Sequence, residues 1–199
     1  WTDPYRWARG SEVLASGRKF NMSDMIALQH DYLSIPARSL VPFFKNLRAA
    51  DPQVEQARQL LLDWDFVLDR DSVTAGIYVA FERQLLDNIN ALKVPAEAQD
   101  LLTVGMKTTI DMLLAPDGDF GPDPLAGRDA FLLRTLAEGV LSLREKLGPN
   151  TDDWVYGQAD YKHALIRHPL SAAVSEEVRA QLDVGPAPRG GNSFTLGNT

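Results

Sequence analysis

Three aspartates between residues 117 and 123 are the first candidates for chemistry in this chain. The stretch DGDFGPD holds Asp117, Asp119 and Asp123, and carboxylates at such short spacing are typical of calcium-binding loops. A loop of the EF-hand type also needs glycine at its sixth position and glutamate at its twelfth, where this chain has Pro122 and Arg128. The sequence therefore favours a solvated turn, and no metal site is predicted.

The three histidines are poorly placed to share a metal ion or to act in catalysis. His163 and His168 are five residues apart, so they lie on opposite faces of a strand or well apart around a helix. His168 precedes Pro169 and is expected to be extended. His30 is next to Asp31 in an expected helix, where neighbouring side chains point apart. A structural or surface role is favoured for all three.

Neither a nucleophile nor a phosphate-binding loop is indicated. The chain has no cysteine, which excludes disulfides, zinc–thiolate sites and cysteine nucleophiles, and it has no G-x-S-x-G motif. Ser72 is better explained as a helix N-cap, with Asp69 and Asp71 beside the positive end of the helix dipole. The stretch RGGN (189–192) lacks the lysine and the spacing of a P-loop. Chemistry alone identifies no active site and no cofactor.

Composition limits the partners of this chain. Its 199 residues suffice for one domain or two small ones, and its formal net charge is −7. Nucleic acids and anionic membranes reward basic patches, so neither is expected as a partner. No apolar run approaches the roughly 20 residues that a membrane span needs, and the N-terminus has no signal-peptide pattern. The lack of an initiator Met predicts a processed or excised segment.

Most of residues 4–147 is expected to be helical. Apolar residues at a spacing of three or four, with start signals before them, predict helices over residues 4–16, 23–47, 52–65, 72–92, 95–115 and 123–148. Ser23, Asp51 and Ser72 are the expected N-caps. Pro36 and Pro42 are expected to kink the second helix or to break it.

The pattern changes after Gly148. Residues 152–170 carry aromatic and β-branched side chains without a helical period, which favours short strands or extended segments. Ser175 is the expected N-cap of one more helix. Residues 185–191 are expected to form a turn, and residues 194–198 to begin a strand. We therefore divide the chain into a helical body (1–150) and an extended, turn-rich tail (151–199).

Four segments, in order, resemble the penicillin amidase (penicillin acylase) family. The first shares with that family Asp24-Met25, Leu28-Gln29, Asp31, Ala37-Arg38 and Leu40 to Pro42. The others are a Leu-Leu-x-Trp-Asp stretch followed by Asp-Ser within 60–81, a Tyr-Gly with a later His-Pro-Leu within 154–170, and Gly-Pro, Gly-Gly and Thr-x-x-Asn within 185–199. Together they cover nearly the whole chain.

The resemblance implies an N-terminal nucleophile hydrolase that cleaves amide bonds. In this family a precursor cuts itself into two chains, and the first residue of the second chain is the nucleophile, with its own α-amino group as base. Residue 1 here is Trp, so the resemblance places this stretch inside the nucleophile-bearing chain. The expected fold class is mainly α: a helical excursion from the αββα core of an Ntn hydrolase, with short strands after about residue 150.

One catalytic residue carries over from the family. The resemblance implies that Arg6 lies near the active site, shortly after the oxyanion-hole asparagine, with Arg9 as the alternative. A guanidinium there would orient the asparagine and raise the local positive potential. The simpler interpretation is a surface arginine paired with Glu12 or Asp3. The oxyanion asparagine and any calcium ligands of the parent enzyme are expected before Trp1, so no cofactor or metal site is assigned to this segment.

Two hypotheses for function follow. In the first, the chain is part of an acylase that removes acyl groups from penicillins, other acylated amines or acyl-homoserine lactones. Its partners would then be the other chain and the sheet core, together with the acyl amide substrate; the parent would be periplasmic or secreted, and the isolated segment inactive. This hypothesis predicts unpaired strand edges and exposed apolar surface near residues 150–199. The alternative is a self-contained helical module that binds a partner without catalysis, which predicts a closed helical core with the tail packed onto it.

Overall fold

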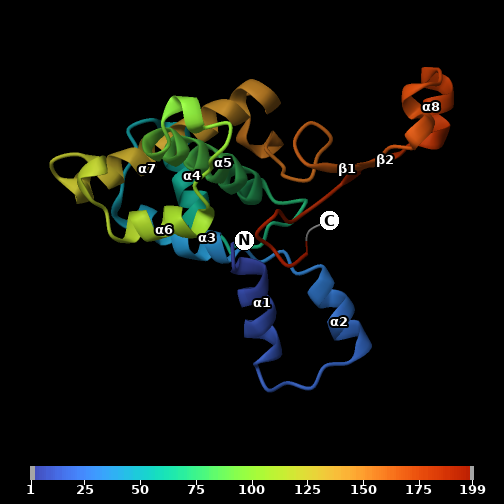
Figure 1. The fold of residues 1–199 in the computed structure, drawn as a ribbon, viewed down its shortest axis with the longest axis horizontal. Coiled ribbons are helices and arrows are strands. Elements are labelled where there is room, and N and C mark those ends of the chain that lie inside the picture. Colours follow the sequence, from blue (N-terminus) through green and yellow to red (C-terminus); the bar gives the residue numbers. More distant parts are fainter. Residues whose placement is uncertain (1–2, 198–199) are drawn as a thin grey trace.

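The computed structural model describes residues 3–197, and the predicted mainly α class is confirmed. Helices form a layered body, and within residues 3–197 one sheet, of two antiparallel strands, lies outside it (Figure 1). The elements are α1 Tyr5–Leu14, α2 Met22–Gln29, α3 Ile35–Leu40, α4 Pro52–Leu62, α5 Val73–Lys93, α6 Met106–Leu114, α7 Pro124–Leu147, β1 His163–Ile166, α8 Glu176–Leu182 and β2 Val184–Pro188.

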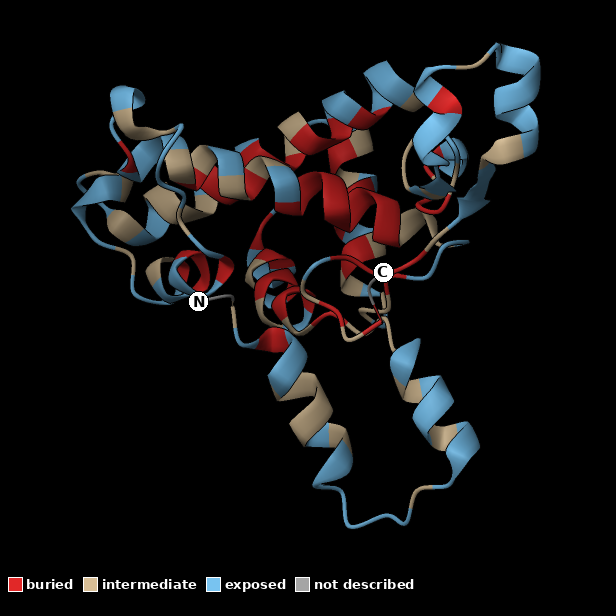
Figure 2. Cartoon of the chain, turned by 45° about the vertical axis from the view of Figure 1, so that its right-hand side comes forward, coloured by how far each residue is buried: buried red, intermediate tan, exposed pale blue. Residues whose placement is uncertain are grey.

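Two arms project from this body (Figure 1). Helices α1 and α2 leave it side by side, and the ribbon of β1 and β2 carries α8 away from it in another direction. Buried residues are concentrated in the body, whereas both arms are mostly exposed or half-buried (Figure 2). The arms therefore depend on their attachment points to hold their direction.

Helix α5 is the centre of the core. Its side chains Tyr78, Phe81, Leu85 and Ile89 are all fully buried, and α7 packs along it closely enough that a Cβ on Gly139 would lie 3.0 Å from the backbone nitrogen of Phe81. The side chain of Ser72 accepts a hydrogen bond from Ala75 N at 3.1 Å, as expected of an N-cap. Asp51 caps α4 in the same way, so both of these predicted caps are confirmed.

Two predicted helices are wrong in detail. The N-cap of α2 is Asn21, not Ser23. Asn21 and Asp24 form a capping box, in which the side chain of each accepts a hydrogen bond from the backbone N–H of the other. The expected break of the region 23–47 near Pro36 and Pro42 is confirmed. The chain turns back to the body at residues 30–34, α3 begins at Ile35 after the Ser34 cap, and a 3₁₀ helix follows at Val41–Asn46. The region 95–115 holds only α6 and a 3₁₀ turn at Ala96–Ala98, because Gly105 starts a new helix.

The predicted end of the tail is also wrong. The expected turn at 185–191 is largely strand β2, which pairs antiparallel with β1 through His163–Pro188 and Ala164–Ala187. The expected strand from Phe194 is a compact series of turns up to residue 197; residue 198 lies outside the described part. Proline and glycine suggested a turn, but cross-strand pairing with β1 holds this segment extended.

The segment after α7 is fixed against the start of α5. Trp154 and Tyr156 are fully buried, and the Tyr161 hydroxyl donates to the carbonyl of Gly76 at 2.7 Å. A Cβ on Gly76 would lie 2.1 Å from the carbonyl oxygen of Trp154. Only glycine therefore allows the two backbones to approach this closely.

We expect Gly76→Ala to lower the free energy of unfolding by about 1–3 kcal/mol, because the new methyl group overpacks this contact. Gly118→Ala is the matched control, since a Cβ there meets no atom within 4 Å; its effect is expected to stay within about 0.5 kcal/mol. Denaturant unfolding measures both. Equal stabilities of the two variants would contradict the close approach.

Candidate functional site

The base of α1 is tied to the body at two points. The carboxylate of Asp3 caps α6, accepting hydrogen bonds from Met106 N at 3.0 Å and Lys107 N at 2.9 Å. The ring of Tyr5 is buried and meets the ring of Phe194 edge-on at 6.1 Å. These contacts fix where α1 begins and therefore where its arginines lie.

Arg6 is exposed and makes one hydrogen bond within residues 3–197. Its Nη2 donates to the carbonyl oxygen of Leu196 at 3.4 Å. It pairs with neither Glu12 nor Asp3, so the simpler surface-pair interpretation is wrong for Arg6. Its other guanidinium donors have no hydrogen-bond partner within residues 3–197.

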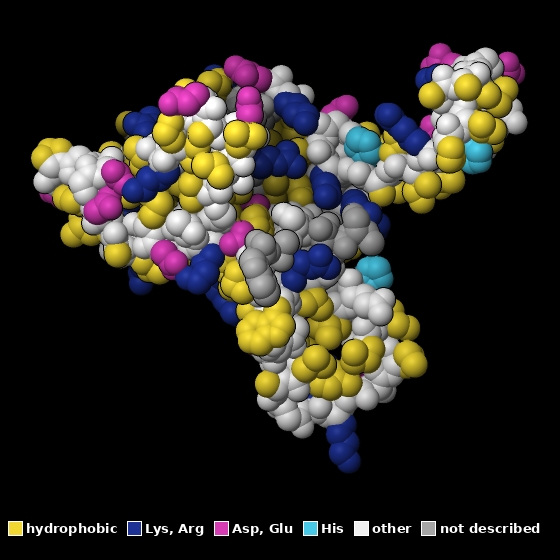
Figure 3. Space-filling view, in the orientation of Figure 1, with side chains coloured by type: hydrophobic (Ala, Val, Ile, Leu, Met, Phe, Trp, Pro, Cys, Tyr) yellow, Lys and Arg dark blue, Asp and Glu magenta, His cyan; other side chains and the backbone are white. Residues whose placement is uncertain are grey.

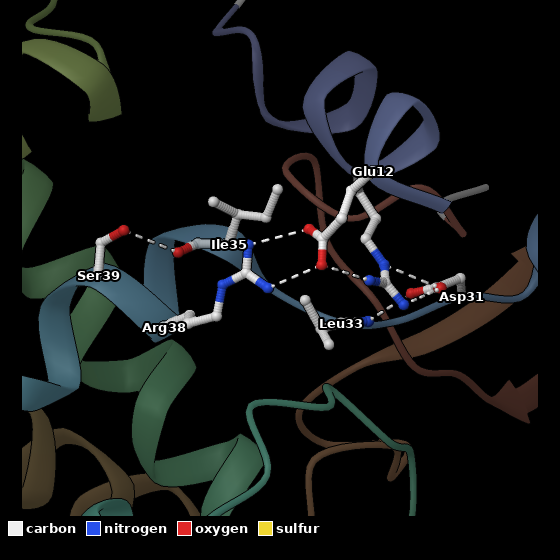
Figure 4. Close-up of polar contacts among 7 residues, drawn as sticks. Glu12, Asp31, Leu33, Ile35, Arg38 and Ser39 are labelled. Carbon is white, nitrogen blue, oxygen red and sulfur yellow. Dashed lines mark hydrogen bonds and ion pairs between the residues drawn. The ribbon is translucent and has the colours of Figure 1, made fainter. Parts of the chain in front are cut away.

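Arg9, the alternative candidate, is held instead in an ion network. Its Nε and Nη2 donate to Oδ2 of Asp31 at 3.0 and 2.8 Å, and its Nη1 donates to Glu12 at 3.3 Å. Glu12 also accepts two hydrogen bonds from Arg38, at 3.1 and 3.0 Å (Figure 4). The hydrogen bonds from Arg38, helped by Arg9, hold the pKa of Glu12 below its ordinary value. Arg9 therefore joins α1 to residue 31, and Glu12 joins α1 to Arg38 of α3.

A cleft of about 380 Å³ opens between α1 and α2 beside this network. Arg9 and Asp31 form its polar side, and Val13 and Leu28 are among its apolar lining residues. The space-filling view shows apolar side chains gathered over these two helices (Figure 3). The most exposed of them are Trp7, Leu14, Met22 and Ile26.

The last described residues, 190–197, form what we call the closing loop. Gly191 N donates to Leu68 O, and Gly197 N donates to Asp31 O, both at 2.8 Å. Gly191 has a φ of 69°, and a Cβ on Gly191 would lie 2.1 Å from the carbonyl oxygen of Gly197. Both facts require glycine at position 191. The loop lies between the core and the base of α1. The carbonyl oxygen of Leu196, within the loop, accepts the hydrogen bond from Arg6.

Glu82 is buried beneath the closing loop. It is 3 % exposed, and its two oxygens accept from the Tyr78 hydroxyl and from Nδ2 of Asn192, each at 2.7 Å. Burial raises the pKa of Glu82 to about 7, although the Tyr78 hydrogen bond and the charge of Arg83 oppose the shift. The sequence analysis missed Glu82. The sequence feature that could have identified it is a single carboxylate at the end of the apolar stretch of α5, because a buried carboxylate needs hydrogen-bond partners.

The other sequence candidates have local structural roles. The side chains of Asp117 and Asp123 accept backbone hydrogen bonds at the starts of the next helical turns, and Asp119 pairs with Lys93. Nδ1 of His168 accepts from Leu170 N at 3.1 Å, and His30 ends α2. Among residues 3–197 no group of three or more acidic, histidine or cysteine side chains is placed to hold a metal ion.

A model of the penicillin amidase family matches residues 1–199, the whole chain. The chain belongs to the penicillin amidase family, whose members are amide hydrolases. No curated protein sequence matches it. No helix within the described residues is long and apolar enough to cross a membrane.

The raised pKa of Glu82 predicts how stability depends on pH. The folded state holds this proton more tightly than the unfolded state, whose glutamate pKa is 4.5, so the stabilisation is fully present below pH 4.5 and is lost as pH rises to about 7. We expect the wild type to lose stability relative to Glu82→Gln across this window, by up to about 1.4 kcal/mol per pH unit. Denaturant titrations at several pH values measure the difference; parallel curves would show that Glu82 is not proton-linked.

Proposed function

We propose that this chain supplies the helical part of a penicillin-amidase-like acylase. The family match over all 199 residues carries the proposal. In this proposal the nucleophile and its free α-amino group come from residues outside the chain. The amine takes the proton of the nucleophile's hydroxyl, which attacks the amide carbonyl, and the resulting oxyanion is stabilised by hydrogen-bond donors.

Arg6 is the residue that we assign to the oxyanion site. Its guanidinium is exposed, and Leu196 O, 3.4 Å away, is its one hydrogen-bond partner within residues 3–197. It can therefore donate to the side-chain oxygen of the oxyanion-hole asparagine, leaving the NH₂ of that amide directed at the substrate oxygen. Arg9 is a poorer candidate, since Asp31 and Glu12 already hold its guanidinium.

The apolar faces of α1 and α2 support an acyl-binding role. Trp7 and Met22 are 75 % and 77 % exposed, and an exposed apolar surface of this kind is typical of a ligand or partner site. We propose that these helices wall the acyl pocket. The substrate class is an acylated amine: a penicillin, another acyl amide or an acyl-homoserine lactone.

The ribbon of β1 and β2 supports a contact with the rest of the enzyme. The described sheet has two strands, each with an unpaired edge, and Ile166 and Val184 on it are 69 % and 65 % exposed. Open edges with apolar side chains favour strand pairing with another segment. We propose that the sheet core of the acylase docks here. A periplasmic or secreted location is part of the same proposal, by resemblance to the family.

A self-contained binding module is the second candidate. Its supporting observation is the closing loop, because Asn192 and Thr195 are buried against the helical body. Hydrolysis of an acyl 4-nitroanilide separates the two candidates: we expect turnover by the complete protein and none by residues 1–199 alone. A complete protein that binds acyl amides without turnover would favour the binding module.

We expect Arg6→Ala in the complete acylase to lower kcat by about 10²–10³-fold, the range seen when one oxyanion-hole group is removed, with a smaller change in KM. Arg134→Ala is the matched control, since Arg134 is an exposed arginine on α7, and it is expected to keep the wild-type kcat. Steady-state kinetics on the same anilide measures both. Equal kcat values for the two variants would remove Arg6 from the site.

A further inference from the structure

We infer that Glu82 is a positioning residue. It fixes the closing loop and, through the loop, the carbonyl oxygen of Leu196 that accepts the hydrogen bond from Arg6. This inference rests on the proposed function, because it assigns to Arg6 the role described above. It adds a buried group on α5 that touches neither the substrate nor the reacting atoms.

The first step is the bond between α5 and the loop. Oε1 of Glu82 accepts from Nδ2 of Asn192 at 2.7 Å, across 110 residues of sequence. Oε2 is held by the Tyr78 hydroxyl, also at 2.7 Å, so the carboxylate cannot rotate away from the loop without losing a second hydrogen bond. Tyr156 adds a parallel tie, donating from its hydroxyl to Gly191 O at 2.7 Å.

The second step is the stiffness of the loop itself. Oδ1 of Asn192 accepts from Phe194 N at 3.0 Å, and Asn192 N donates to Oγ1 of Thr195 at 2.9 Å. The Thr195 hydroxyl also lies 2.8 Å from the carbonyl oxygen of Gly197. Both Asn192 and Thr195 are buried. Residues 192–197 therefore move together, and the Asn192 side chain sets their position.

The third step is the contact with the arm. Leu196 O accepts from Arg6, and the adjacent Gly197 N donates to Asp31 O. The loop thus meets both arginine positions of α1, directly at Arg6 and through Asp31 at Arg9. A shift of Asn192 displaces the Leu196 carbonyl and changes the direction in which the Arg6 guanidinium points.

Core stability alone is a weak reason for a carboxylate here. Buried charges cost free energy, and apolar side chains of similar volume often stabilise as much or more. An apolar residue would leave the amide of Asn192 without its acceptor and the loop without its anchor. The geometry thus gives Glu82 a role in placing the loop.

A double-mutant cycle in the complete acylase tests the inference. Glu82→Leu removes the hydrogen bonds to both Tyr78 and Asn192, whereas Asn192→Ala removes only the bond between Glu82 and the closing loop. If Glu82→Leu does not fold, the kcat of Asn192→Ala still tests the inference. We expect each to lower kcat by about tenfold with little change in KM, the order of loss that misplacement of a catalytic group produces. Glu82→Gln is expected to restore kcat, since its amide still accepts from Asn192 and donates to Tyr78.

The decisive readout is the coupling with Arg6. In an Arg6→Ala background we expect Asn192→Ala to lower kcat no further, because the group it positions is gone. Asn88→Ala is the structural control: Asn88 donates to Thr135 and Glu138 between α5 and α7, away from the loop, and it is expected to lower stability while leaving kcat unchanged.

The outcomes separate this inference from the proposed function. Losses that multiply in the double variant, or wild-type kcat in both Glu82→Leu and Asn192→Ala, would overturn the positioning role while Arg6→Ala still impairs catalysis. A complete protein without amide hydrolysis would instead overturn the proposed function, and the inference with it.

Discussion

The burial of α5 is the constraint on which the rest of the structure depends. Because the first half of this helix is buried on all sides, the polar groups there need hydrogen-bond partners, and several of these partners come from another segment. Ser72 O accepts from Tyr156 N, Gly76 O accepts from the Tyr161 hydroxyl, and Glu82 accepts from Asn192. The tail of the chain is thereby attached to α5 at its start and near its middle, and the base of α1 is attached to the tail.

The arms follow a different physical rule from the body. α1 and α2 bury few side chains of their own, and their direction is set by hydrogen bonds and ion pairs at the base, among them Arg9 with Asp31 and Glu12 with Arg38. Partly exposed ion pairs add little to the free energy of unfolding, so their main effect here is to fix the direction of the two helices. The apolar side chains on the outer faces of α1 and α2 stay exposed because the arms have no core of their own to cover them.

The sequence predicted most of what depends on local pattern, with the Ser23 cap of α2 as an exception, and missed what depends on distant contacts. Ser72, Asp51 and Ser175 cap helices as expected, because a cap is a matter of three or four neighbouring residues. The strand at Val184–Pro188 was missed because its partner, His163–Ile166, makes it a strand. Arg6 could be named from a family pattern, whereas its Leu196 partner lies 190 residues away. No spacing rule links positions so far apart.

The cap that Asp3 provides to α6 has a consequence for folding. Its acceptor oxygens and the amides of Met106 and Lys107 are more than 100 residues apart, and closing so long a loop carries a large entropic cost before any contact forms. Contacts of this separation generally form late, after local helices and their neighbours have assembled. The direction of the arm that carries Arg6 is therefore set by a contact that α1 cannot make without a helix about 100 residues further along the chain.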